Sequence, residues 1–161
     1  MKKITSQIEY EIYTNSDELP KQDQGLLKEA VAAAGNAYAP YSGFNVGAAV
    51  LLDNGVIVQG NNQENAAYPS GLCAERVAVF SASANYPGIH IKAIAITAKF
   101  NSKNEILAVS PCGNCRQVIA EYEHRFNNNI RLIMTGENNS VVVFPSIKML
   151  LPMLFNSGML K

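Results

Sequence analysis

The sequence of 161 residues has little charge and no excess of either sign. Its 13 Lys and Arg balance its 13 Asp and Glu, so the formal net charge at pH 7 is zero. Proteins that bind polynucleotides usually carry surplus Lys and Arg, which displace counterions from phosphate. The missing surplus argues against nucleic acid as a partner. Charged residues make up only 16% of the chain, and a short chain with so little charge is expected to bury surface against other subunits.

Long apolar runs are also missing. Met1-Lys2-Lys3 could begin a signal peptide, but the apolar stretch that must follow is absent. No segment approaches the roughly 20 apolar residues that a membrane span requires. There are three cysteines, and an odd number cannot be fully paired within one chain, so a disulfide framework is not expected. We therefore expect a cytoplasmic protein that does not associate with membranes.

The hydrophobic pattern predicts a single domain over residues 1–161. Polar and apolar residues alternate over 7–12, which indicates a half-buried strand that adds an edge to the sheet. The Asn54-Gly55 pair suits the positive backbone angles of a hairpin turn. The remaining predicted elements are helices over 20–38, 73–84, 114–126 and 146–151, and strands over 44–52, 56–60, 89–98, 130–134 and 141–144. This order predicts an α/β fold whose mixed five-stranded sheet has helices on both faces.

All three cysteines fall at predicted helix N-termini. Unpaired amide N–H groups and the positive end of the helix dipole lower the pKa of a thiol there and favour the thiolate that binds metal. The two-residue gap between Cys112 and Cys115 is a common spacing of zinc ligands, and Cys73 would supply a third. A Cys-x-x-Cys pair also occurs in redox proteins, but the surrounding pattern lacks a thioredoxin-like setting.

The number of ligands bears on whether such a zinc site is structural or catalytic. Structural sites usually have four protein ligands, whereas catalytic sites keep three and leave the fourth position to water. The chain has no fourth cysteine, and its two histidines, His90 and His124, are expected to be ordinary exposed or hydrogen-bonded residues. Three ligands with one open position favour catalysis.

Two charged residues follow Cys73 in the first turn of the same predicted helix. A Glu or Arg at such a position usually lies at the surface. Beside an open metal site, however, the Glu75 carboxylate could take a proton from metal-bound water and return it elsewhere. Arg76 could donate to a ligand sulfur and offset the net negative charge of three thiolates on one Zn²⁺.

At this point the motifs match a family. The segment CAE at 73–75, followed by PCGNCRQ at 111–117, resembles the zinc-dependent cytidine deaminases. Three further blocks resemble the nucleoside-binding segments of the small cytidine deaminases: YAPYS at 38–42, FNVGAA at 44–49 and NQENAAYPS at 62–70. The similarity runs from about residue 26 to 155, and residues 1–20 form an N-terminal extension outside the family pattern.

The resemblance implies roles for individual residues. Asn62 and Glu64 match the pair that holds the ribose 3′-hydroxyl, and Phe44 matches an aromatic residue of the base and sugar pocket. The backbone of Ala74 and the carboxylate of Glu75 would meet the pyrimidine edge. The remaining implied residues are Phe155, which would stack on the base across a subunit boundary, and Tyr68, which would sit near a neighbouring subunit's site. The resemblance also implies one Zn²⁺ per chain on Cys73, Cys112 and Cys115, and a homotetramer.

The reaction that the resemblance implies is hydrolytic deamination of cytidine and 2′-deoxycytidine, with release of ammonia, in pyrimidine salvage. Water activated by zinc would attack C4 of the cytosine ring while Glu75 transfers protons. One alternative is a deaminase for another cytosine nucleoside such as blasticidin S, although Asn62, Glu64 and Phe44 favour an ordinary nucleoside. Deaminases of deoxycytidylate or transfer RNA mostly have His in place of Cys73. A non-catalytic, zinc-stabilised nucleoside-binding module would not need Glu75.

Overall fold

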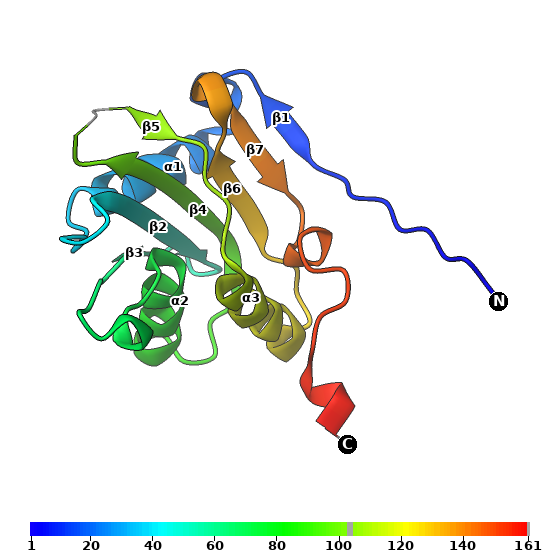
Figure 1. Cartoon of the computed structure of the whole chain (residues 1–161). Helices are drawn as coiled ribbons and strands as arrows, with labels where there is room; N and C mark the ends of the chain where they lie inside the picture. The colour runs from blue at the N-terminus through cyan, green and yellow to red at the C-terminus, as the bar shows by residue number, and fades with distance from the viewer. Residues whose placement is uncertain (103–104, 161) are drawn as a thin grey trace.

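The structure is a computed structural model that describes residues 1–102 and 105–160, and it is an α/β fold in three layers (Figure 1). The strands of its sheet are β1 (Glu11–Tyr13), β2 (Phe44–Leu52), β3 (Ile57–Asn61), β4 (Ile91–Phe100), β5 (Ile106–Leu107), β6 (Arg131–Thr135) and β7 (Val141–Phe144). The α-helices are α1 (Lys21–Ala34), α2 (Ala74–Asn85) and α3 (Gly113–Phe126). Short 3-10 helices are η1 (Ser16–Glu18), η2 (Tyr68–Ser70), η3 (Glu137–Asn139), η4 (Ile147–Met149) and η5 (Ser157–Leu160).

The sheet is mixed, as predicted. Its strand order is β1-β7-β6-β4-β2-β3, and β5 pairs with the end of β4. The β4–β6 pair is parallel and is connected through α3, whereas β2 pairs antiparallel with both β3 and β4. The parallel pair explains why a helix must cross over between β4 and β6, because parallel strands cannot be joined by a tight turn.

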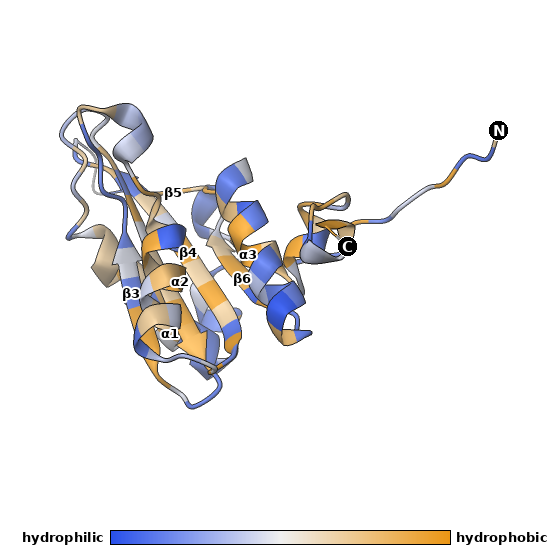
Figure 2. Cartoon of the chain, turned by 90° about the horizontal axis from the view of Figure 1, so that it is seen from below, coloured by the Kyte–Doolittle hydropathy of each residue, from blue (hydrophilic) through white to orange (hydrophobic). Residues whose placement is uncertain are grey.

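Side-chain alternation along the central strands divides the core into two clusters. On β2, Ala48, Val50 and Leu52 belong to the cluster formed with α2 and α3. Ala49 and Leu51 belong to the cluster formed with α1 on the opposite face. Figure 2 shows apolar residues concentrated where the helices face the sheet. This two-sided burial explains why β2 is apolar along most of its length.

Two glycines allow helices to approach the sheet closely on opposite faces. A Cβ atom at Gly47 would lie 2.0 Å from the Ala30 carbonyl oxygen of α1. A Cβ atom at Gly60 would lie 2.4 Å from the Ala78 amide nitrogen and 2.6 Å from the Ala74 carbonyl oxygen of α2. Because these neighbours are backbone atoms, α2 can lie this close to β3 only with glycine at position 60.

The structure corrects several predicted details. The sheet has seven strands in the described residues instead of five, because β1 adds the predicted edge strand and the two-residue β5 was missed. The edge strand covers 11–13 instead of 7–12, because β7 offers partners only at Val141–Val143. The first helix ends at Ala34, four residues early, and the predicted helix over 146–151 is only the single turn η4. In the described part of the chain, no helix is long and apolar enough to span a membrane.

Candidate active site

Two helix N-termini meet at the cysteines. Cys73 is the N-cap residue of α2 and Cys112 the N-cap residue of α3, while Cys115 lies in the first turn of α3. The three sulfur atoms all lie within 4.8 Å of one another, and the Sγ atoms of Cys73 and Cys112 are 3.7 Å apart. Thiolates bound to one tetrahedral Zn²⁺ have sulfur atoms about 3.8 Å apart, given a Zn–S distance of about 2.3 Å. The geometry therefore fits one zinc ion.

The electrostatics around the sulfur atoms favour a thiolate. Hydrogen bonding from the Cys115 thiol, together with the Arg76 guanidinium 3.7 Å from the Cys73 sulfur, lowers the pKa of the Cys73 thiol to about 5. The pKa of the Cys115 thiol is raised because that thiol donates to Cys73 and is buried. The Arg76 guanidinium thus lies against the Cys73 sulfur. Its Nε is buried and has no hydrogen-bond partner among the described residues.

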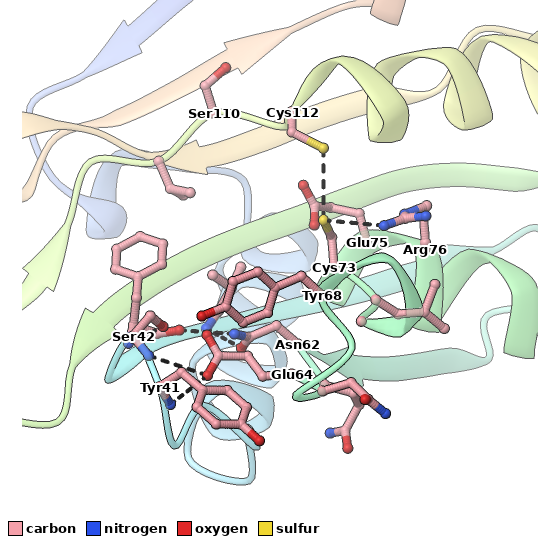
Figure 3. Close-up of a pocket in the computed structure, with 17 residues that line it drawn as sticks. Tyr41, Ser42, Asn62, Glu64, Tyr68, Cys73, Glu75, Arg76, Ser110 and Cys112 are labelled. Atoms are coloured by element: carbon pink, nitrogen blue, oxygen red, sulfur yellow. Dashed lines mark hydrogen bonds between the residues drawn. The ribbon is translucent and has the colours of Figure 1, made fainter.

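Glu75 is the only acidic residue in the first turn of α2, and its side chain is 4% exposed. Its carboxyl group lies beside Cys73 and Cys112 in the same cavity (Figure 3). Burial raises the pKa of this carboxyl group, and the negative charge of the Cys73 thiolate raises it further. A carboxyl group with a raised pKa next to a metal site is suited to taking up and releasing a proton.

The cavity has a volume of about 640 Å³, within the usual range of small-molecule sites. Cys73, Glu75, Arg76 and Cys112 form its metal-binding end. The other end lies over the start of β2 and the segment that follows β3, where Phe44, Asn62, Glu64 and Tyr68 line it. The structure thus brings eight of the predicted site residues, from three separate parts of the chain, into one cavity.

The Asn62 side chain is fixed by the backbone of β2. Its Nδ2 donates to the Phe44 carbonyl oxygen at 2.9 Å, and its Oδ1 accepts from the Val46 amide at 2.7 Å. One N–H and one lone pair of this amide remain after these two bonds. A hydroxyl group can therefore still both donate to Asn62 and accept from it.

The Glu64 side chain lines the cavity and is hydrogen-bonded to the loop that precedes β2. Its Oε2 accepts from the Tyr41 amide at 2.8 Å and from the Ser42 amide at 3.3 Å. Hydrogen bonds from Ser42 and from the Tyr41 backbone lower the pKa of this carboxyl group. Glu64 is therefore a carboxylate at neutral pH, and it acts as an acceptor.

Aromatic residues line the end of the cavity away from the cysteines. The Phe44 ring packs edge-on against Phe100, with ring centroids 5.2 Å apart. Tyr68, in η2, has a similar contact with Tyr41 at 6.3 Å and is 78% exposed. Tyr68 lines the cavity of its own chain, and its expected position near a neighbouring subunit's site remains a prediction.

Three predicted residues do not line the cavity. Ala74 is fully buried at the start of α2, and Cys115 is buried behind the other two cysteines. Phe155 is half-exposed, and its carbonyl oxygen accepts from the Gln117 side chain at 2.7 Å. Its proposed contact with the base of another subunit remains a prediction.

Sequence reasoning missed several residues at the site. Tyr41 and Ser42 bind Glu64 through their backbone amides, a role that side-chain identity does not reveal. Arg116 holds the loop that precedes Cys112, donating to the Pro111 carbonyl oxygen at 2.9 Å and the Ser110 hydroxyl at 3.1 Å. It also donates to the Leu150 carbonyl oxygen at 2.9 Å. The sequence could have indicated this role, because Arg116 directly follows Cys115.

Comparison with known proteins identifies the family to which the chain belongs. The family model described as the cytidine and deoxycytidylate deaminase zinc-binding region matches residues 20–127. The chain belongs to this deaminase family. The matched region contains all three cysteines and Glu75, and zinc is the cofactor of the family. Residues 1–19 and Phe155 lie outside the match.

Individual family members are similar to the chain over most of its length. A cytidine deaminase of Halalkalibacterium halodurans is 46% identical over 98 residues, 61% of this chain and 70% of the relative. One from Mycobacterium tuberculosis is 42% identical over 105 residues, 65% of this chain and 74% of the relative. The crystal structure of a Burkholderia pseudomallei cytidine deaminase superposes with a TM-score of 0.69 at 39% identity, covering 81% of this chain and 97% of that one.

Proposed function

We propose that this deaminase hydrolyses cytidine and 2′-deoxycytidine to uridine and 2′-deoxyuridine and releases ammonia. The observation that carries the proposal is the position of Glu75, a buried carboxyl group with a raised pKa, in one cavity with cysteines arranged to bind zinc. The similarity to cytidine deaminases supports the same reaction. A structural zinc site would have no use for a proton carrier beside its ligands.

Cys73, Cys112 and Cys115 would hold the zinc ion, which, when bound, acts as a Lewis acid that lowers the pKa of water. Glu75 takes the proton of the attacking water and delivers it to N3 of the cytosine ring. Protonation of N3 prevents negative charge from building up on the ring as C4 becomes tetrahedral. Glu75 then carries a second proton from the new C4 hydroxyl group to the amino group, the C4–N bond breaks, ammonia leaves and the C4=O bond forms.

The rest of the cavity would recognise the nucleoside. Asn62 and Glu64 bind the ribose 3′-hydroxyl, since the amide retains a donor and an acceptor and the carboxylate is an acceptor. Phe44 and Tyr68 line the base and sugar pocket. The backbone of Ala74 meets the pyrimidine edge, and Arg76 offsets the charge of the thiolates.

The assembly and setting form part of the proposal. The 161 residues act as one deaminase domain with an N-terminal extension over 1–20, and four chains form a homotetramer. Phe155 then stacks on the base in a neighbouring chain's site. Thiolate ligands require a reducing compartment, which supports a cytoplasmic enzyme of pyrimidine salvage.

The test is an ultraviolet assay of cytidine conversion with purified protein, with and without a strong zinc chelator. We expect deamination that the chelator abolishes. The matched variant Glu75→Gln keeps the shape of the side chain but cannot carry a proton, so we expect it to retain zinc and to lose about 10²- to 10⁴-fold in kcat. Zinc content is measured for both proteins by elemental analysis. Chelator-insensitive turnover, or a Glu75→Gln variant of nearly normal activity, would refute the mechanism.

A further inference from the structure

Residues 1–10, here called the N-terminal arm, extend away from the body of the molecule in both views (Figures 1 and 2). The arm has large apolar side chains at three of its five even positions, with Lys2 and Ser6 at the other two. The three remain exposed: Ile4 is 81% exposed, Ile8 56% and Tyr10 52%. Thr5, Gln7 and Glu9 occupy the odd positions between them. In an extended segment, alternate side chains point to the same side, so Ile4, Ile8 and Tyr10 share one side of the arm, with Ser6 between the two isoleucines, and the other side is polar from Thr5 to Glu9.

Strand β1 shows which face of the sheet the apolar side of the arm continues. Ile12 pairs with Val142 of β7, and Tyr10 stacks on Phe144 with ring centroids 5.2 Å apart. Val142 and Phe144 pack in the cluster that includes α2 and α3. The even positions of the arm therefore continue the sheet face that carries these two helices.

A groove lies on this same sheet face, and its lining is mainly apolar. It has a volume of about 400 Å³, and Val109, Met134, Val142, Phe144 and Leu150 are among the residues that line it. We refer to it as the β6–β7 groove. An extended chain with apolar side chains on one side is a type of ligand that suits an open, mainly apolar groove over two strands.

The register of β1 places Tyr10 at the Phe144 end of its own chain's groove and directs residues 1–9 away from that groove. β1 runs antiparallel to β7, with Tyr13 opposite Val141 and Glu11 opposite Val143. The arm therefore leaves past Phe144, the last residue of β7. The groove extends in the opposite direction, toward Gly136 before the start of β7. To enter its own groove the arm would have to reverse direction, whereas it can reach a groove on another molecule directly.

We propose that the N-terminal arm of one copy of this chain binds in the β6–β7 groove of a second copy. Each chain has both an arm and a groove, so two copies related by a twofold axis can exchange arms in a closed, self-complementary contact. The inference goes beyond the proposed deaminase activity, because residues 1–19 lie outside the family match.

Such a contact would also reach the active site. Val109 and Ser110 line both the β6–β7 groove and the cavity that contains Glu75. An arm in the groove would therefore pack against the far side of the loop that leads to Cys112.

The first test compares the two faces of the arm by analytical ultracentrifugation of the full-length protein. The apolar-face variant changes Ile4 and Ile8 to Ser, and the matched control changes Thr5 and Gln7 to Ser; Tyr10 is kept because it stacks on Phe144 of its own chain. We expect the apolar-face changes to raise the dissociation constant of the assembly at least about tenfold and the control to change it less than about twofold. Equal effects of the two variants, or a full-length chain that is monomeric throughout, would overturn the proposal. Deamination assays on the same proteins report separately on the proposed function.

The second test identifies the partner surface. A photo-crosslinking amino acid replaces Ile8, and equal amounts of ¹⁵N-labelled and unlabelled protein are mixed, allowed to exchange and irradiated. We expect cross-linked peptides that join the arm of one isotope to residues 134–144 of the other. Cross-links found only within one isotope, or only to surfaces outside the groove, would show that the arm does not bind there.

Discussion

At the scale of single residues, Glu64 combines a structural and a recognition role. Its Oε2 accepts from the amides of Tyr41 and Ser42, which fixes the loop before β2 and keeps the pKa of the carboxyl group low. The described residues give no bond to its second oxygen. That oxygen is therefore available to accept from a sugar hydroxyl group. The two roles can be separated by changing the enzyme and the substrate independently.

We predict that Glu64→Ala lowers kcat/KM for cytidine about 10- to 100-fold, because a charged acceptor for the 3′-hydroxyl is lost. The same variant should discriminate little between cytidine and 3′-deoxycytidine, whereas the wild type should strongly prefer cytidine. Steady-state kinetics with both substrates on both proteins gives the coupling between the carboxylate and the hydroxyl. A variant that keeps the wild-type preference while losing activity would restrict Glu64 to holding the loop.

The site residues whose proximity could be predicted from the sequence alone are those with local spacing. Cys73 and Glu75, and likewise Cys112 and Cys115, lie within one helical turn, so their proximity follows from helix geometry. Glu123 shows the opposite case. It is 3% exposed and accepts from the Ile130 amide, the Ser146 hydroxyl and the Ile147 amide. In the sequence it looks like any charged residue of an amphipathic helix, because the groups that it binds belong to distant loops.

At the scale of secondary-structure elements, the position of α2 depends on one glycine of β3. Gly60 faces the Ala74 carbonyl oxygen and the Ala78 backbone, so the first turn of α2 lies directly on the strand. That turn contains Glu75 and follows Cys73. Gly47 makes an equally close contact with α1 on the other face of the sheet, away from the cavity. The two glycines thus form a natural pair of test sites.

We predict that Gly60→Ala shifts the first turn of α2 and lowers kcat/KM about 100-fold, since small displacements of reacting groups have effects of this size. Gly47→Ala should lower the free energy of unfolding by about 1–3 kcal/mol, as much as Gly60→Ala does, because each added methyl group overpacks the core. Its activity per folded molecule should remain near normal. Thermal unfolding and cytidine kinetics measured on both variants compare the effects. Equal losses of activity would mean that the position of α2 relative to β3 has no special importance.

The elements that were predicted most accurately are those with strong patterns. The strand over 44–52 has the same bounds in β2, because nine residues free of Pro are followed by an Asn-Gly turn. β5 was missed because two residues cannot show an alternation, and it forms only because the edge of β4 is available. The first helix was extended too far because Tyr38 continues the helical spacing of Ala30 and Ala34 past Gly35, where the observed helix is capped.

At the scale of the whole molecule, the metal site joins parts of the chain that the topology keeps separate. Cys73 begins α2 after the β2–β3 hairpin, whereas Cys112 and Cys115 begin α3 after the long strand β4. Beside the sulfur atoms, the buried Nε of Arg76 has no hydrogen-bond partner in the described residues. The described protein groups alone therefore do not use all the hydrogen-bond donors of this region. Bound zinc would link the two helix N-termini directly and should act as a structural as well as a chemical group.

We therefore predict that removing zinc destabilises the entire fold. A ligand that binds only the folded state at about 1,000 times its Kd contributes about 4 kcal/mol, and for a domain of this size each kcal/mol shifts Tm by about 2–4 °C. Calorimetry with and without a chelator should then show a fall in Tm of about 8–16 °C. Cys112→Ala provides the control, because a chain that has already lost zinc should show a low Tm that the chelator leaves unchanged. If the wild-type Tm stays constant after complete removal of zinc, the two helices are held together by packing alone and the metal serves only the chemistry.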